Sequence, residues 1–222
     1  DCTQDCAGEW GGSSVVDSCG VCGGDGSSCL ASLSLGTFDS SGSLEILYDF
    51  GSDVAGFQFD VSGLALDASG ASGGAAESSG FMVSAGSSTV LGISLVGDVI
   101  PAGSGVLTVL SFSAVTGDST ELSFGNSGAV SLSTGETLEL SFSGSLAHTQ
   151  DCAGEYYGGA LEDDCGVCNG NNSDKDCAGD CGGSAVEDNC GTCDSDSSND
   201  CTQDCAGEWG GVAALDDCGV CD

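Results

Sequence analysis

The sequence predicts an all-β protein in which an antiparallel β-sandwich is flanked by small, irregular, disulfide-rich repeat modules. Three observations lead to this prediction. The 16 cysteines lie in residues 1–29 and 152–222 and leave 30–151 without any. The cysteine-free middle has apolar residues at every second position, and one short cysteine motif recurs on both sides of it. The middle is long enough to bury a core, whereas the cysteine-rich segments are too short to do so without cross-links.

Period-two alternation predicts the strands of the middle segment. Leu44, Ile46 and Tyr48 share one strand face, while Glu45 takes the other. The run 106–112 is apolar on both faces, which predicts a central strand. Since no stretch has a helical period, we expect about eight or nine short strands forming a sandwich. The remaining alternating segments are 57–61, 91–95 and 138–142, and clusters of Gly, Ser and Asp predict turns at 51–53, 67–74, 84–88 and 116–119.

A Cys-Gly-x-Cys motif marks the repeats. It occurs at Cys19/Cys22, Cys165/Cys168, Cys190/Cys193 and Cys218/Cys221. Residues 200–222 also match the beginning of the chain in register, with a period of 199 residues, which is typical of a tandem array. The predicted divisions are a repeat at 1–29, the sandwich at 30–148, repeats at 149–175 and 176–199, and an incomplete repeat at 200–222.

The cysteines predict disulfides in an oxidising, extracellular setting. The repeat register favours separate rings, each closed by the nearest available cysteine, and we expect the partners of Cys2 and Cys221 to lie outside this sequence. Zinc is the alternative use of paired cysteines, but no histidine lies nearby and carboxylates surround the sulfurs. The expected pairs are Cys6–Cys19, Cys22–Cys29, Cys152–Cys165, Cys168–Cys177, Cys181–Cys190, Cys193–Cys201 and Cys205–Cys218.

Charge favours calcium as a cofactor. The chain has 35 acidic residues against one basic residue, Lys175, so we expect no nucleic-acid partner, and anionic membranes are poor partners for such a surface. Ca²⁺ takes oxygen ligands from flexible acidic loops, and acids recur in register in each repeat. The alternative is that these acids form a solvated surface. The candidate ligands are Asp17, Asp25, Asp163, Asp174, Asp176, Asp188, Asp194, Asp196, Asp200 and Asp216.

Two stretches of the middle segment, 54–61 and 100–107, look like parts of a cohesin-type sandwich. That resemblance implies a jelly-roll-like fold found in extracellular bacterial assemblies, although no dockerin-like duplicated calcium segment accompanies it. Separately, residues 19–29 resemble the non-catalytic junction ahead of the spacer in the ADAMTS metalloproteases. The zinc-protease His-Glu motif of those enzymes has no counterpart in this chain.

These observations predict a structural extracellular repeat protein: a calcium-stabilised, disulfide-stapled fibre, stalk or surface filament whose partners are copies of itself. The alternative is an adhesion module that binds a protein or surface glycans through the sandwich. We expect no enzymatic activity, because no nucleophile–base set is evident. The sequence has no membrane span. Asn171 is a formal glycosylation acceptor, and His148 is expected to be a surface linker residue.

Overall fold

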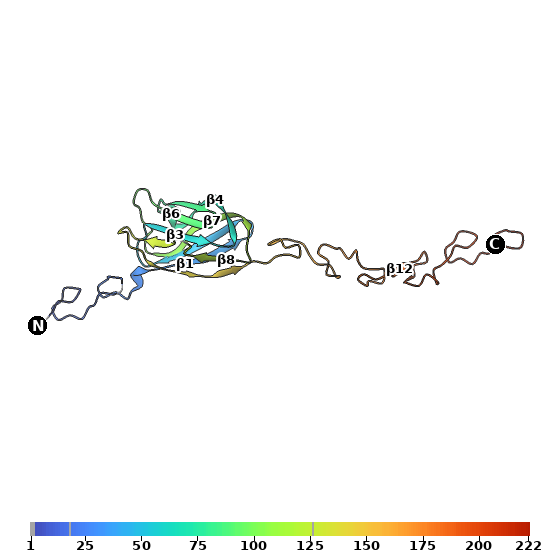
Figure 1. The fold of residues 1–222 in the computed structure, drawn as a ribbon, viewed down its shortest axis with the longest axis horizontal. Helices are drawn as coiled ribbons and strands as arrows, with labels where there is room; N and C mark the ends of the chain where they lie inside the picture. The colour runs from blue at the N-terminus through green and yellow to red at the C-terminus, as the bar shows by residue number, and fades with distance from the viewer. Residues whose placement is uncertain (1–2, 18, 126) are drawn as a thin grey trace. The chain divides into compact units, whose positions relative to one another are not determined.

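The computed structural model describes residues 3–17, 19–125 and 127–222. The chain divides into two compact units, Asp1–Thr149 and Gln150–Asp222 (Figure 1). The first unit contains a short cysteine-rich head followed by a two-sheet β-sandwich. The second unit consists almost entirely of turns and loops. The predicted boundaries between the individual repeats of the second unit, at 175/176 and 199/200, stay predictions.

The sandwich confirms the predicted all-β class. One sheet has the strand order β10-β1-β2-β7-β4, and the other has the order β11-β8-β3-β6-β5, with β9 also paired to β3. The strands of the first sheet are β1 (Leu30–Asp39), β2 (Ser43–Phe50), β4 (Leu64–Ser72), β7 (Gly103–Val115) and β10 (Glu139–Ser143). Those of the second are β3 (Gly56–Val61), β5 (Met82–Gly86), β6 (Thr89–Ile93), β8 (Ser119–Ser123), β9 (Ala129–Ser131) and β11 (Ser145–Ala147).

Two features differ from a purely antiparallel, helix-free sandwich. Strands β1 and β10 pair in parallel, from Leu30↔Glu139 to Ser34↔Ser143. A parallel pair needs a long connection, and the chain between these two strands supplies it. A short helix, α1 (Gly74–Ser78), connects β4 to β5. It begins at Gly74, which has positive φ like Gly73 before it, and alternation could not indicate this.

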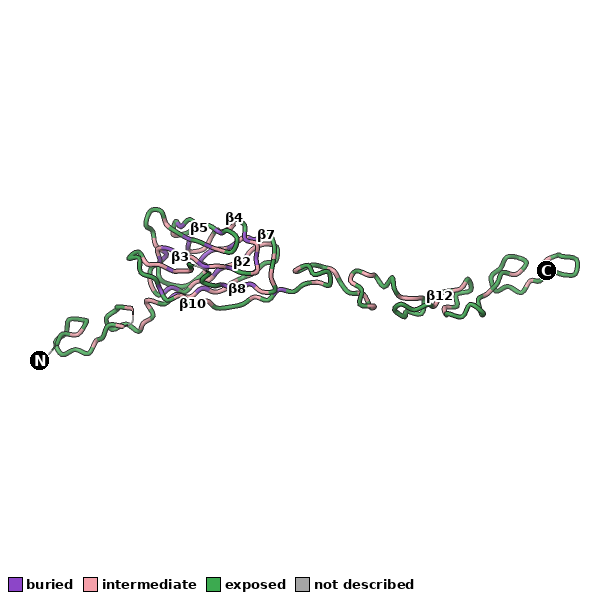
Figure 2. Tube along the Cα trace, viewed as in Figure 1, coloured by how far each residue is buried: buried purple, intermediate pink, exposed green. Residues whose placement is uncertain are grey.

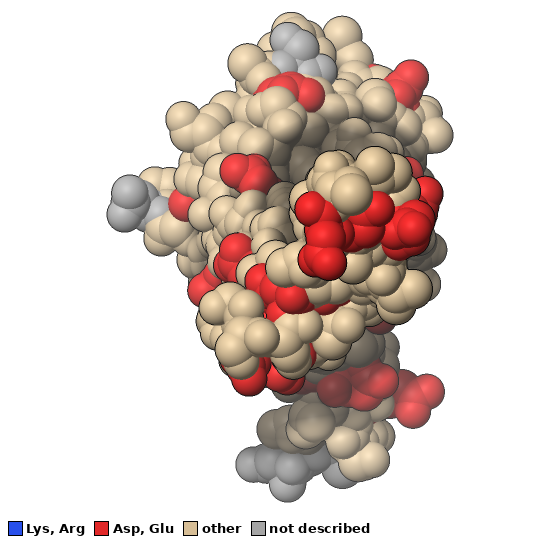
Figure 3. Space-filling model, turned by 90° about the vertical axis from the view of Figure 1, so that its right-hand side faces the viewer, with Lys and Arg blue, Asp and Glu red and all other residues tan. Residues whose placement is uncertain are grey.

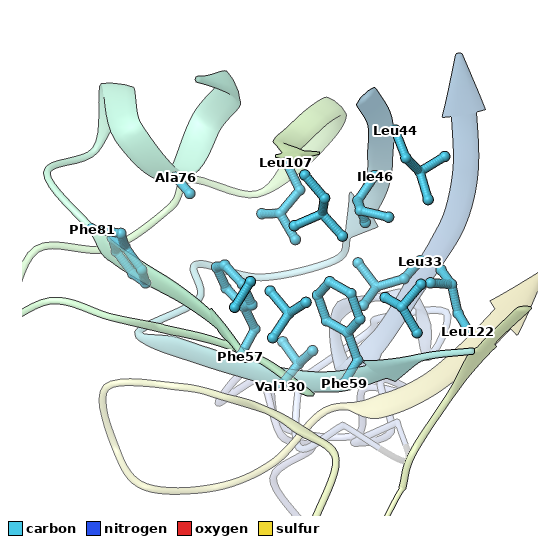
Figure 4. Close-up of a cluster of buried hydrophobic side chains, with 14 of the residues drawn as sticks. Leu33, Leu44, Ile46, Phe57, Phe59, Ala76, Phe81, Leu107, Leu122 and Val130 are labelled. Carbon is cyan, nitrogen blue, oxygen red and sulfur yellow. The ribbon is translucent and has the colours of Figure 1, made fainter. Parts of the chain in front are cut away.

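The core lies between the two sheets (Figure 4). Leu44 and Ile46 of β2 point inward, as their alternation predicts, and both are fully buried. Phe57 and Phe59 of β3 face them from the other sheet. The predicted central strand is β7, which lies between β2 and β4 and buries Leu107. The sandwich therefore has its own hydrophobic core.

The second unit has no such core. None of residues 150–222, all of which the structure describes, is buried (Figure 2). Its regular structure is one short antiparallel pair, β12 (Val186–Glu187) with β13 (Cys193–Asp194). Hydrophobic burial therefore cannot hold this unit together, and its order must come from hydrogen bonds and cross-links.

Candidate functional site: aspartate loops linked by disulfides

One loop geometry recurs along both cysteine-rich segments. In its Asp151 example, carboxylate Oδ1 accepts hydrogen bonds from the backbone N–H groups of Ala153 (2.9 Å) and Glu155 (3.0 Å), two and four residues later. We call this unit an aspartate loop and name each loop by its aspartate. The same pair of bonds is made by Asp5, Asp17, Asp163, Asp176, Asp188, Asp204 and Asp216.

A β-bridge and a glycine close each loop. In the Asp151 loop, Gln150 bridges Tyr156, and the N–H of Gly154 donates to the Asp151 carbonyl oxygen at 3.0 Å. Gly154 has φ 84°, in the left-handed region that residues with a Cβ rarely adopt. Every aspartate loop has a glycine at this position with φ between 75° and 89°. The spacing Asp-x-x-Gly therefore specifies the turn.

The second carboxylate oxygen ties the loop to the chain that follows it. Oδ2 of Asp151 accepts the N–H of Ala160 at 2.9 Å, nine residues later, and five other loops repeat this bond. A Cβ on Gly158 would lie 2.1 Å from Asp151 Oδ2, so only glycine leaves room for the carboxylate. The same holds at Gly12, Gly24, Gly170, Gly183 and Gly211. The glycine seven residues after each of these six aspartates is thus part of the loop.

These hydrogen bonds favour the ionised carboxylates. The N–H groups of Ala160 and then Glu155 lower the pKa of Asp151 below its ordinary value. Backbone N–H donors likewise lower the pKa of Asp5, Asp17, Asp163, Asp176, Asp188 and Asp204. A carboxylate that accepts several backbone N–H groups is stabilised in its charged form. These seven loops are therefore organised around a negative charge.

The disulfides differ from the predicted separate rings, and none of the expected pairs forms. Five bonds share a sequence separation of 16. Successive bonds from Cys152 to Cys201 overlap: Cys152–Cys168 encloses Cys165, whose own bond runs forward to Cys181. The complete set is Cys6–Cys22, Cys19–Cys29, Cys152–Cys168, Cys165–Cys181, Cys177–Cys193, Cys190–Cys201 and Cys205–Cys221. Overlapping bonds form a ladder rather than a row of rings.

The loop geometry explains why the cysteines pair in this overlapping way. The second cysteine of each Cys-Gly-x-Cys motif occupies the bridge position, beside the chain that enters the loop, so it bonds backward to the preceding loop. The first cysteine bonds forward, as Cys19 does to Cys29. Cys221 consequently pairs with Cys205, whereas Cys218 is the free and exposed thiol. The expectation for Cys2 falls outside the described residues.

Most of the candidate calcium ligands have hydrogen-bonding roles in the loops. Asp17, Asp163, Asp176 and Asp188 use both carboxylate oxygens on backbone N–H groups, and Asp216 uses Oδ1. Asp25, Asp194 and Asp196 make local turn bonds, and no carboxylate bond is seen for Asp174 or Asp200. Across the described part of the chain, no group of three or more His, Cys, Asp or Glu has a metal-binding arrangement. The prediction missed Asp5, Asp151 and Asp204, which the spacing Asp-x-x-Gly could have found.

Carboxylates gather around one hollow of the second unit. Asp188, Asp194 and Asp200 line a space of about 510 Å³ together with Glu187 and Trp209. Figure 3 shows acidic side chains spread over the face in view, with no basic side chain among them. Lys175, the only basic residue in the sequence, forms an ion pair with Asp164 at 2.6 Å. Three of the predicted calcium ligands thus line one hollow, although they are not in a metal-binding arrangement.

The predictions for His148 and Asn171 have different outcomes. His148 is buried, not a surface residue: its Nε2 lies 2.7 Å from Thr120 Oγ1, and its ring packs on Phe38. Burial lowers the pKa of His148. Asn171 lies exposed in a turn with φ 53°, and its glycosylation stays a prediction.

The sandwich offers a second candidate surface. Met82 of β5 and Leu91 and Ile93 of β6 are 62 %, 38 % and 40 % exposed. Met82 is the register partner of Ile93 in the β5–β6 pair, and the three side chains share the outer face of the sheet. Among the described sandwich residues, Phe124 is the one exposed aromatic. The surface is thus aliphatic, without an aromatic platform.

Comparisons with known proteins give structural neighbours only. No family model and no curated protein matches the sequence. Among solved structures, a non-cellulosomal cohesin from the archaeon Archaeoglobus fulgidus is similar at 15 % identity and a TM-score of 0.36, over 50 % of this chain and 85 % of that one. The sixth cohesin of scaffoldin B from Acetivibrio cellulolyticus, in complex with a dockerin, is similar at 19 % identity and a TM-score of 0.38, over 53 % and 97 %.

A third neighbour, the cohesin CaCohA2 from Clostridium acetobutylicum, gives 15 % identity and a TM-score of 0.35, over 53 % of this chain and 90 % of that one. Within the described residues, no helix has the length and apolar character needed to span a membrane.

Proposed function

We propose that this chain is a structural unit of an extracellular array, in which the sandwich is a bead and the aspartate loops form a stapled spacer. The observation that carries the proposal is the ladder of overlapping disulfides in the second unit. Each bond connects one loop to the next, so the ladder limits how far any part of 152–201 can be extended. A spacer that bears tension needs this property.

The chemistry of the loops supports an extracellular role. A unit without buried residues has little hydrophobic stabilisation to lose or gain, and each disulfide that closes a loop of this size contributes about 3 kcal/mol in the chain-entropy model. Such cross-links persist in oxidising compartments. The 18 acidic residues of 149–222 face one lysine, so their mutual repulsion opposes collapse of the spacer onto itself.

Single-molecule pulling on the oxidised chain tests this role. The sandwich carries no disulfide between β1 and β11, so its unfolding should release about 400 Å of chain in one event, at about 3.4 Å per residue. The ladder should contribute no comparable event until a reductant is added. Stepwise lengthening of the oxidised ladder below the unfolding force of the sandwich would contradict the proposal.

We also propose that Ca²⁺ screens the repulsion between the carboxylates of the loops. The hollow lined by Asp188, Asp194 and Asp200 concentrates carboxylates with few counter-charges, and Ca²⁺ accepts such oxygen donors. We expect about millimolar Ca²⁺ to slow proteolysis and amide exchange in 187–201. The control is Mg²⁺ at equal ionic strength, since general screening would act equally for both ions. Equal protection by the two ions would count against a calcium site and leave the disulfide spacer unaffected.

The second candidate function is a binding module, favoured by the exposed face of Met82, Leu91 and Ile93. Because the face is aliphatic, its partner would be a protein with apolar side chains rather than a glycan. Capture from the extracellular fraction with the immobilised chain should yield a partner that Leu91→Asp loses. Leu95→Asp is the matched control, because Leu95 is 73 % exposed but follows the end of β6. Capture that survives Leu91→Asp, or specific signals on a glycan array, would contradict this assignment.

A further inference from the structure

The chain enters and leaves the sandwich in different ways. At the entry, Cys29 stands directly before β1, is stapled to Cys19 and packs against the core. The N–H of Gly51, after the end of β2, donates to the Leu30 carbonyl oxygen at 2.9 Å and so holds the start of β1. After the exit, the first cysteine of the sequence is Cys152. The exit from the sandwich therefore depends on noncovalent contacts.

Strand β11 gives the exit little support. It has three residues, Ser145–Ala147, and pairs with β8 at the end of the second sheet. A side-chain hydrogen bond of this strand, from Ser145 Oγ to Glu121 Oε1 at 3.0 Å, is exposed to solvent. An exposed bond of this kind exchanges with bonds to water and contributes little net stability. A strand so short would separate easily from β8 under load.

His148, the residue after β11, fastens the exit to both sheets. Its backbone N–H donates to the carbonyl oxygen of Asp118, one residue before β8, at 2.8 Å. Its Nε2 lies 2.7 Å from Oγ1 of Thr120 in β8. Its ring packs on Phe38 of β1, with 5.2 Å between the ring centres, and Phe38 stacks on Phe112 of β7. The His148 side chain thus contacts strands of both sheets.

The contacts of the His148 side chain are buried, unlike the Ser145 bond. His148 is 8 % exposed and Thr120 is fully buried. A buried hydrogen bond that loses one partner leaves the other partner unsatisfied, which costs more than the loss of an exposed bond. The ring contact with Phe38 adds the packing energy of an aromatic pair. Separation of β11 from β8 therefore requires His148 to leave a buried site.

We propose that His148 is a latch through which tension passes from the exit of the sandwich into its two sheets. A pull on Thr149 reaches the buried contacts of His148 before it reaches the pairing of β11 with β8. His148 acts as a positioning residue, because it holds β11 in place through Thr120 and Phe38. The latch deepens the proposed structural function and rests on it, since an array under tension transmits only the force that each sandwich withstands.

Amide exchange measured by NMR on the full oxidised chain tests the latch. In His148→Ala, the protection factor of the residue-148 amide should fall about tenfold or more relative to that of the β2 amides, which lie in the middle of the first sheet. Thr120→Val should act in the same direction, and it serves as the test if His148→Ala fails to fold. Ser145→Ala is the matched control, because it removes an exposed hydrogen bond from the same strand.

Force spectroscopy separates a latch from a general contribution to stability. The full chain would be held by non-cysteine handles at positions 30 and 149 and pulled at constant force. After correction for the unfolding free energy of each variant, His148→Ala should unfold about tenfold faster than Val90→Ala at the same force. Val90 is the control because it is fully buried in β6, with β3 and β8 between β6 and β11.

Three results would overturn the latch. They are an equal loss of protection at residue 148 and in β2, an equal loss in Ser145→Ala and His148→Ala, and equal unfolding rates of His148→Ala and Val90→Ala under load. None of these results affects the ladder. An inextensible segment 152–201 would leave the spacer function standing while the latch fails, whereas an extensible ladder would contradict the spacer function whatever the His148 variants show.

Discussion

The overlapping staples of the second unit should make it tolerant to the loss of one of them. We consider the double variant Cys165→Ser/Cys181→Ser, which removes the staple between the Asp163 and Asp176 loops. In the native chain, a pull on 152–201 follows the shortest covalent path, across four disulfides and along about ten residue steps between them. The bridged Cα atoms are 5.4 to 6.1 Å apart. At about 3.5 Å per step, this path is about 58 Å long.

The variant should have almost the same length. Without Cys165–Cys181, the path runs from Cys168 directly to Cys177 and crosses the three remaining staples. It then contains about 12 residue steps and measures about 59 Å, so the contour length should change by about 2 Å. Separate rings closed by neighbouring cysteines would lose two staples in the same variant, and the path would lengthen by about 65 Å.

Force spectroscopy at high load can separate these outcomes. The chain would be held by non-cysteine handles at positions 149 and 202, and the contour length of the native and variant chains compared before and after reduction. Full reduction should lengthen the 152–201 part of either chain to about 170 Å, which calibrates the assay. A gain near 65 Å in the oxidised variant would refute the overlapping ladder and the reasoning that each bridge-position cysteine bonds backward.

Three further predictions concern the loops and the sandwich. Asp151→Asn keeps an oxygen acceptor for Ala153 and Glu155 but replaces Oδ2 by an NH₂ donor, so amide exchange measured by NMR should accelerate at Ala160 and not at Glu155. Equal acceleration at both amides would contradict the separate roles of the two carboxylate oxygens. Burial lowers the pKa of His148 below 6.5, so the folded state binds a proton less readily than the unfolded state. The thermal stability of the sandwich should therefore be full above about pH 6.5 and fall below that pH. His148→Gln should flatten this pH dependence. A native chain equally stable at pH 7.5 and 5.5 would refute that reasoning. Gly210→Ala should speed amide exchange around Cys201 more than Gly11→Ala speeds it around the Asp5 loop. Both glycines have positive φ, but only Gly210 lies against a disulfide. Equal effects of the two substitutions would mean that the disulfide does not constrain this position.

The sandwich was predictable because its pattern is local. Alternation along 44–50 and 57–61 places Ile46 and Phe59 inside, and both are fully buried. The apolar run 106–112 has no polar face, so it had to be a central strand, as β7 is. The parallel pairing of β1 with β10 was not predictable, because it depends on which free edge the returning chain reaches.

The aspartate loops likewise have features that the sequence predicts and features that it does not. Glycine three residues after the aspartate is required by its positive φ, and glycine seven residues after it by the nearby carboxylate. Both spacings can be read in the repeats, yet the aspartates were interpreted as metal ligands. A carboxylate in a repeat suits Ca²⁺ and backbone N–H donors equally well, and only the positions of Ala160 and its equivalents show where Oδ2 points. The burial of His148 was missed because its partner Thr120 is distant in sequence.

By itself, the sequence determined the division into a cysteine-free sandwich and cysteine-rich repeats, together with the repeat register, and it predicted an oxidising setting. It also indicated that the two sulfurs of Cys-Gly-x-Cys bond in opposite directions. Only the tertiary structure decided which sulfur goes which way: the bridge between the residue before each aspartate and the residue five after it places the second cysteine beside the incoming chain. Sequence distance favours the nearest cysteine, but a disulfide forms where the loop brings two Cα atoms within about 6 Å.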